Sequence, residues 1–144
     1  MIKSDKNIMD APSPRAHILI VDDDPVLRRL FGSILSNAGY DVLDAPDADQ
    51  GQELAGRLQP DLILMDKNLP GMDGIKASVR LKKDQKTAHI PIILLTNEDL
   101  STETEKMMKE ASIIDCIQKR VSNEEFVERI KKILDGAGAK PTVK

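Results

Sequence analysis

The sequence predicts an α/β domain in which a parallel sheet carries helices on both faces. Five short apolar runs begin near residues 17, 41, 61, 90 and 113, and stretches with helical periodicity separate them. Strands that alternate with helices in this way pair in parallel. The first, third and fourth runs are almost continuous Ile, Leu, Val and Met, which predicts strands buried on both faces. The second and fifth runs are more mixed, so they are expected at the edges of the sheet.

Each helical stretch has a start signal of the kind that polar caps provide. Helices are expected after Asp24, Asp47, Asp73, Ser101 and Ser122. Pro25 suits a first helical position, which leaves Asp24 as the N-cap. Gly39 and Gly136 are expected to end the first and last helices. One amphipathic face of the first helix is predicted from its spacing and comprises Leu27, Leu30, Phe31, Ile34, Leu35 and Ala38.

Buried strands in the middle and mixed strands at the edges predict the order 2-1-3-4-5. This is the flavodoxin-like (βα)5 arrangement, a doubly wound sheet whose ligand crevice lies at the carboxyl ends of strands one and three. The predicted domain covers residues 16–135, and residues 1–15 and 136–144 are expected to be disordered tails.

Composition restricts the classes of function. A chain of 144 residues fits one domain, and its net charge of −3 argues against nucleic acid as the partner. The single cysteine excludes an intrachain disulfide and fits a reducing compartment. No apolar run approaches the ~20 residues that cross a bilayer, and the polar N-terminus with Pro12 and Pro14 does not resemble a signal peptide. A cytoplasmic protein without a membrane partner is therefore expected.

Five polar residues follow the predicted strands, and the topology brings them to one edge of the sheet. They are Asp22 and Asp23 after the first strand, Asp66 after the third, Thr96 after the fourth and Lys119 after the fifth. Carboxylates that converge with no cation paired to them call for a hard divalent metal, best Mg²⁺. We expect Asp23 and Asp66 to raise each other's pKa in the metal-free protein. A lysine and a hydroxyl suit an anionic oxygen, so the spacing predicts a phosphoaspartate site.

The chain resembles the receiver domains of two-component response regulators over about residues 16–135. The motifs that carry the resemblance are "ILIVDDDPVLRR", "DLILMDKNLPGMDG", "PIILLT" and a lysine after the fifth strand. The resemblance implies that Asp66 is the phosphoacceptor. It also implies that Thr96 hydrogen-bonds the phosphoryl group and that Lys119 pairs with its oxygens.

The metal site follows from the same resemblance. Asp23 would ligate Mg²⁺ directly together with Asp66, Asp22 would act through a water, and Asn68 would offer its backbone carbonyl. The expected protein is a single-domain response regulator rather than an enzyme, although it catalyses its own phosphorylation and dephosphorylation. Its partners would be a histidine kinase or histidine phosphotransfer protein and an unknown downstream protein, reached by contact or phosphorelay.

Two positions depart from the family pattern. The family usually follows its lysine with a proline in a cis bond, whereas this chain has Arg120, so a trans bond is expected. Cys116 stands where the family usually has an aromatic side chain that rotates when the threonine moves. A thiol cannot fill the same volume, so we expect the relay from threonine to aromatic ring to be absent or altered.

Two alternatives remain open on sequence grounds. A pseudo-receiver that binds partners without phosphorylation would fit the departures at Cys116 and Arg120. A small phosphatase of the haloacid-dehalogenase type would use Asp22 as nucleophile and Asp24 as acid and base, but that alternative leaves "MDKNLPGMDG" unexplained.

Overall fold

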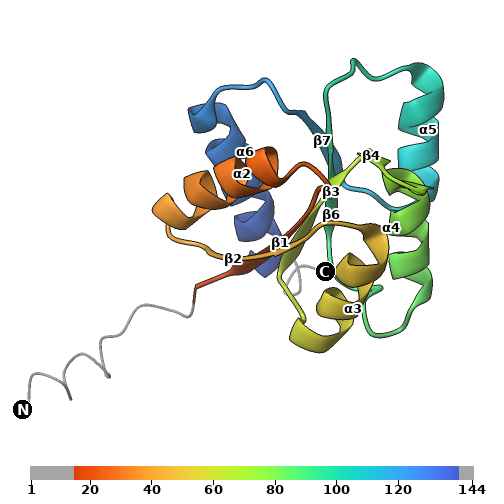
Figure 1. Cartoon of the computed structure of the whole chain (residues 1–144), viewed down its shortest axis with the longest axis horizontal. Coiled ribbons are helices and arrows are strands. Elements are labelled where there is room, and N and C mark those ends of the chain that lie inside the picture. Colours follow the sequence, from red (N-terminus) through yellow and green to blue (C-terminus); the bar gives the residue numbers. More distant parts are fainter. Residues whose placement is uncertain (1–14, 140–144) are drawn as a thin grey trace, which may run out of the picture.

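The computed structural model describes residues 15–139 and forms a five-stranded parallel sheet with helices on both faces (Figure 1). The sheet has the order β2-β1-β3-β6-β7, which confirms the predicted fold class and strand order. The strands of this sheet are β1 (His17–Val21), β2 (Asp41–Ala45), β3 (Leu62–Asp66), β6 (Ile92–Thr96) and β7 (Asp115–Gln118). The predicted tails fall largely on residues 1–14 and 140–144, which lie outside the described residues.

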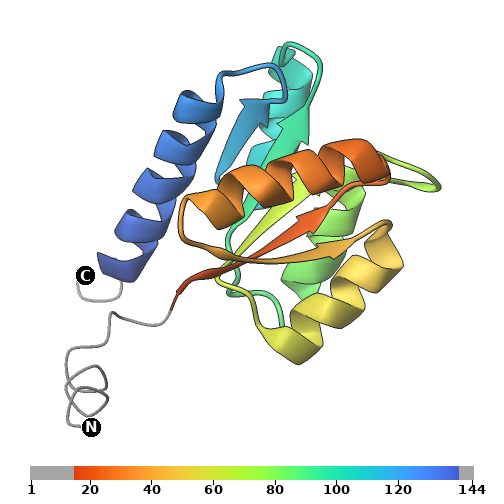
Figure 2. The ribbon, with the colours of Figure 1, turned by 60° about the vertical axis from the view of Figure 1, so that its left-hand side comes forward.

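Two helices cover one face of the sheet and three cover the other (Figures 1 and 2). The helices are α2 (Pro25–Asn37), α3 (Ala48–Leu58), α4 (Gly74–Lys83), α5 (Thr102–Glu110) and α6 (Asn123–Ala139). Alternate residues of β1 point to opposite faces: Ile18 and Ile20 belong to the buried cluster shared with α2 and α6, whereas Leu19 and Val21 belong to the cluster shared with α3, α4 and α5. The central strands are apolar throughout because both of their faces are covered.

The predicted edge strands are confirmed. β2 and β7 each pair with one neighbour only, and their residues are mostly half-buried. β3 and β6 lie in the centre and are buried along their whole length, including Asp66 and Thr96 at their ends. Both polar residues are therefore carried into the interior by the strands that bear them.

All five predicted helix starts are confirmed by hydrogen bonds. Asp24, Asp47, Asp73 and Ser101 are N-caps whose side chains accept from backbone N–H groups of the first helical turn. Ser122 likewise accepts from the N–H of Glu125. These caps satisfy donors that have no partner within the helix.

Several details of the prediction are wrong. Gly136 does not end the last helix, which continues to Ala139, because glycine weakens a helix without stopping it. Leu30 was assigned to the buried face of α2 but is 47% exposed. The five predicted strands also left out a short antiparallel pair, β4 (Asn68–Leu69) with β5 (Met72–Asp73), which lies within the "DLILMDKNLPGMDG" motif.

Candidate functional site

The parallel register brings the carboxyl ends of the central strands to one edge. Val21 at the end of β1 pairs with Met65, so Asp22 and Asp66 are the next residues on neighbouring strands. Asp66 in turn pairs with Leu95, one residue before Thr96. The predicted convergence is therefore a direct consequence of register.

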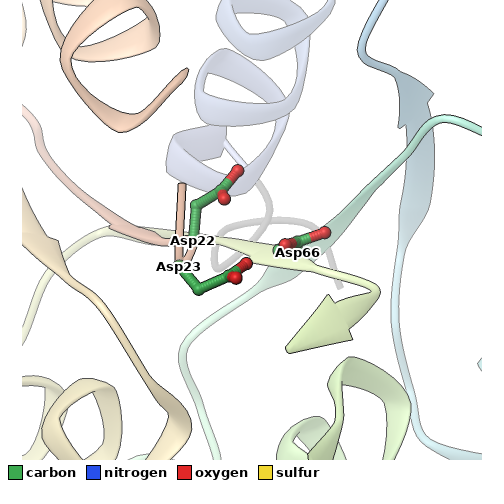
Figure 3. Close-up of side chains that lie close together, drawn as sticks. All are labelled: Asp22, Asp23 and Asp66. Atoms are coloured by element: carbon green, nitrogen blue, oxygen red, sulfur yellow. The ribbon is translucent and has the colours of Figure 1, made fainter. Parts of the chain in front are cut away.

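Three carboxylates meet at this edge. One oxygen from each of Asp22, Asp23 and Asp66 lies within 4.8 Å of the others. Figure 3 shows the three side chains close together at the ends of β1 and β3. Asp22 and Asp66 are buried, whereas Asp23 is exposed, so the cluster has one side open to solvent.

A lysine is paired to these carboxylates, contrary to the expectation that no cation would be. Lys119 places Nζ 3.0 Å from Oδ2 of Asp22 and 3.2 Å from Oδ1 of Asp66. Its side chain is only 8% exposed. The sequence argument treated Lys119 as a group for the phosphoryl oxygens alone, whereas a buried ammonium with two buried carboxylates in reach pairs with both.

Burial and ion pairing have opposite effects on the pKa values of Asp66 and Lys119. The pKa of Asp66 is raised from 3.8 to about 6 by burial and by the charge of Asp22, against the opposing effect of Lys119. The sequence predicted that the charge of Asp23 would raise this pKa. In the structure the charge that raises it is that of Asp22. Burial would lower the pKa of Lys119, but the contacts and charges of Asp22 and Asp66 raise it. The lysine therefore stays protonated while Asp66 gains and loses a proton near neutral pH.

The donor set fits a hard divalent cation. Within residues 15–139, the close partner of the buried Oδ2 of Asp22 is the Lys119 ammonium at 3.0 Å. Three carboxylates with a single ammonium leave an excess of negative charge. Oxygen ligands of this kind, with one side open for water and phosphate, are those that Mg²⁺ uses.

Backbone contacts hold the two buried carboxylates in place. Oδ1 of Asp22 accepts from the N–H of Asp24 at 2.9 Å, and the carbonyl of Asp22 accepts from the Arg28 guanidinium at 2.8 Å. Oδ1 of Asp66 accepts from the N–H of Asn68 at 3.2 Å, the same oxygen that Lys119 contacts. Among the described residues nothing donates a hydrogen bond to Oδ2 of Asp66.

Gly74 at the start of α4 allows that helix to lie against the end of β3. A Cβ on Gly74 would lie 2.1 Å from the backbone oxygen of Asp66. The N–H of Gly74 donates to the carbonyl of Lys67 at 2.7 Å, which closes the β4–β5 excursion back onto β3. No side chain larger than hydrogen fits at this position without moving the backbone.

The backbones of Thr96 and Lys119 are joined by a hydrogen bond. The N–H of Lys119 donates to the carbonyl of Thr96 at 2.8 Å. The Thr96 hydroxyl oxygen accepts from the N–H of Glu98 at 3.0 Å. Because a hydroxyl donates once and accepts twice, this contact leaves the Thr96 proton available to an anion.

The two departures from the family pattern are visible in the structure. No cis peptide bond occurs in residues 15–139, so the expected trans bond between Lys119 and Arg120 is confirmed. Cys116 is half-buried, and burial with the charge of Asp115 raises the pKa of its thiol to about 11. This thiol is therefore protonated at neutral pH and behaves as a small apolar group.

Sequence reasoning missed several contacts that shape the site. Arg28 supports the Asp22 backbone, and Lys67 forms an ion pair with Glu98 across the edge, Nζ to Oε1 3.5 Å. Gln118 and Arg120 both reach Asp99 in the loop after β6. Gly74 had a signal, since it stands inside the "GMDG" stretch, but the other contacts join segments that no local pattern connects.

Comparisons with known proteins place the chain in a family. A sequence profile of the response regulator receiver domain matches residues 18–131. Protein PilH of Pseudomonas aeruginosa is 37% identical over 122 residues, which are 84% of this chain and 99% of PilH. The DNA-binding dual master transcriptional regulator RpaA of Synechocystis sp. is 41% identical over 118 residues, which are 81% of this chain. The chain spans about half the length of the first curated relatives, 48% of RpaA and 52% of a phosphate regulon regulator.

Solved structures agree with this assignment. A response regulator receiver domain protein (CheY-like) from Methanospirillum hungatei JF-1 superposes with a TM-score of 0.81 and 28% identity, covering 88% of this chain and 99% of that one. The chain therefore belongs to the response regulator receiver domain family, a family of two-component signalling. Among the described residues, no helix combines the length and the apolar character that a membrane crossing requires.

Proposed function

We propose that this chain is a single-domain response regulator that accepts a phosphoryl group on Asp66. The observation that carries the proposal is the environment of that carboxylate. Asp66 is 3% exposed, its pKa is raised to about 6, and Lys119 lies 3.2 Å away. A buried carboxylate destabilised by Asp22 and matched with a fixed ammonium is suited to exchange its charge for that of an acyl phosphate.

The transfer uses the carboxylate oxygen that the protein leaves free. Oδ1 of Asp66 is occupied by Lys119 and Asn68, so Oδ2 is the nucleophile. Its lone pair forms the bond to the phosphorus of a phosphohistidine, the P–N bond breaks, and its electron pair stays on the imidazole nitrogen. Water later attacks the same phosphorus, which releases inorganic phosphate and regenerates the Asp66 carboxylate.

Lys119 and Thr96 are proposed to hold the transferred group. The Lys119 ammonium already contacts Asp22 and Asp66, so it lies within reach of the oxygens of a phosphoryl group carried by Asp66. The Thr96 hydroxyl keeps its proton for a phosphoryl oxygen because its oxygen accepts from Glu98. Both interactions strengthen as negative charge builds up on the transferring oxygens.

The proposed cofactor is Mg²⁺, which Asp22, Asp23, Asp66 and the backbone carbonyl of Asn68 would hold. When bound, the cation supplies positive charge for the phosphoryl oxygens. The chain's own contribution is to hold the three carboxylates close together despite the repulsion between their negative charges. Three carboxylates gathered around a single ammonium leave an excess of negative charge, which supports this assignment.

The proposed partners are a histidine kinase or histidine phosphotransfer protein as donor and an unidentified protein as target, in the cytoplasm. Receiver domains work with partners of these kinds, and the near full-length match to PilH supports a chain that signals by contact or phosphorelay.

Intact mass after incubation with acetyl phosphate tests the proposal. Wild type with Mg²⁺ should gain one phosphoryl group, and chelation or Asp66→Asn should abolish the gain. Asp49→Asn is a matched control, since Asp49 is an exposed carboxylate on α3. Peptide mapping must place the group on Asp66. A group on Asp22 would favour a phosphatase, and a chain that takes up no phosphoryl group from acetyl phosphate or a phosphohistidine donor would be a binding module.

A further inference from the structure

One exposed carboxylate in the loop after β6 gathers side chains from both sides of Lys119. Oδ1 of Asp99 accepts from Nε2 of Gln118 at 2.7 Å and from a guanidinium nitrogen of Arg120 at 3.1 Å. We call Asp99, Gln118 and Arg120 the Asp99 clasp. Its outer members are the residues immediately before and after the lysine of the site.

Backbone contacts extend the clasp into a continuous attachment between two segments. Gln118 also donates to the carbonyl of Glu98 at 3.4 Å, and Arg120 to the carbonyl of Asn97 at 3.4 Å. Between them, the N–H of Lys119 donates to the carbonyl of Thr96 at 2.8 Å. Residues 96–99 and 118–120 are therefore joined at each step along their length.

These two segments carry the two side chains that the proposed function assigns to the phosphoryl group. Thr96 begins one segment and Lys119 lies in the middle of the other. If the segments moved independently, the hydroxyl and the ammonium would each have to find the phosphoryl oxygens separately. A fixed relative position removes part of that entropic cost.

The chemistry of the clasp suits an adjustable attachment. Hydrogen bonds from Gln118 and Arg120, with the charge of Arg120, hold the pKa of the Asp99 carboxyl below its usual range. Exposed ion pairs of this kind contribute little to global stability. A surface contact without function is the simpler explanation for any one of these bonds. Their convergence on both neighbours of Lys119 is what distinguishes this group.

We propose that the Asp99 clasp positions Thr96 against Lys119 so that both side chains engage a phosphoryl group together. This rests on the proposed function of Asp66. Gln118 and Arg120 are positioning residues, since neither touches the three carboxylates. In this chain Arg120 stands where the family usually has proline and Cys116 replaces the aromatic relay, so the clasp supplies a connection between the two loops by other means.

Binding of beryllofluoride, a mimic of the phosphoryl group, tests the clasp in the full chain with Mg²⁺. Asp99→Ala should weaken beryllofluoride binding three- to tenfold, measured by fluorine NMR titration. Magnesium affinity, measured without beryllofluoride, should stay within twofold, because the three carboxylates do not contact the clasp. Hydrogen exchange at residues 97–100 should quicken in the variant.

Two further variants sharpen the test. Arg120→Ala should weaken beryllofluoride binding less than Asp99→Ala, because Gln118 still reaches Asp99 in that variant. The loss in the double variant should be smaller than the sum of the two single losses, because Asp99 and Arg120 share one contact. Glu103→Ala removes a nearby exposed carboxylate in the first turn of α5 and should leave both affinities unchanged.

The outcomes separate the clasp from the function on which it rests. Unchanged beryllofluoride binding in Asp99→Ala overturns the clasp, and so does an equal loss of magnesium and beryllofluoride affinity, which would indicate general damage to the site. Wild type that binds no beryllofluoride and gains no phosphoryl group on Asp66 overturns the proposed function, and the clasp with it.

Discussion

Replacing Asp66 by Asn should stabilise the metal-free protein, and the gain should depend on pH. The ionised carboxylate is buried beside Asp22, and its pKa is raised from 3.8 to about 6. A shift of this size corresponds to about 3 kcal/mol of unfavourable free energy carried by the ionised form. Asn is neutral at every pH and keeps an oxygen that can accept from the N–H of Asn68, so it avoids that cost.

The sign of the pH dependence follows from proton binding. Between pH 4 and pH 6 the folded protein holds a proton on Asp66 that the unfolded chain has released. The Asp66 contribution to stability therefore falls as pH rises through this window and is constant above it. The difference in free energy of unfolding between Asp66→Asn and wild type should grow from near zero at pH 4 to at most about 3 kcal/mol at pH 8. Lys119 does not titrate in this window, since its pKa is raised.

Urea denaturation in the presence of a chelator, repeated from pH 4 to pH 8, measures this difference. Groups that titrate equally in both proteins cancel, so the difference curve isolates Asp66. Asp49→Asn removes only an exposed ion pair with Arg80, so it should change the free energy of unfolding by less than about 1 kcal/mol across the whole pH range. A difference for Asp66→Asn that does not change with pH, or a variant less stable than wild type at pH 8, would refute the electrostatic account.

Four other substitutions separate the proposed metal site from its scaffold. Asp23→Asn should remove most of the stabilisation by Mg²⁺ in thermal melts. It should change the free energy of unfolding of the metal-free protein by less than about 0.5 kcal/mol, because this carboxylate is exposed. A clear drop in stability without metal would contradict this. Gly74→Ala should lower the free energy of unfolding by at least about 2 kcal/mol in urea denaturation, since its Cβ would lie 2.1 Å from the Asp66 backbone oxygen. Gly136→Ala is the control: it has open space around it and should be neutral or stabilising. Asp24→Ala should cost about 1 kcal/mol by loss of the N-cap of α2, with magnesium affinity retained; loss of that affinity would show that the cap also fixes the metal ligands.

The sequence by itself determined the order of elements and the place of the site. Apolar runs at regular intervals, with caps such as Asp24 and Asp47 between them, are local signals, because a strand or a helix start depends on neighbours in the chain. The side of the sheet on which Asp22, Asp66 and Thr96 meet follows from topology, since parallel strands end at one edge. Local signals were weaker at the helix end near Gly136, where glycine was compatible with either outcome.

Only the tertiary structure decided the electrostatics of the site. The sequence showed that Lys119 follows the last strand. Its ammonium contacts both Asp22 and Asp66 because β7, which precedes Lys119, pairs with β6 in the folded sheet. The closeness of Gly74 to the Asp66 backbone, and the gathering of Gln118 and Arg120 on Asp99, likewise join segments far apart in the chain. Ion pairing and burial fall off over a few ångströms, so they are fixed by the packed distances between such segments, which no pattern within one segment contains.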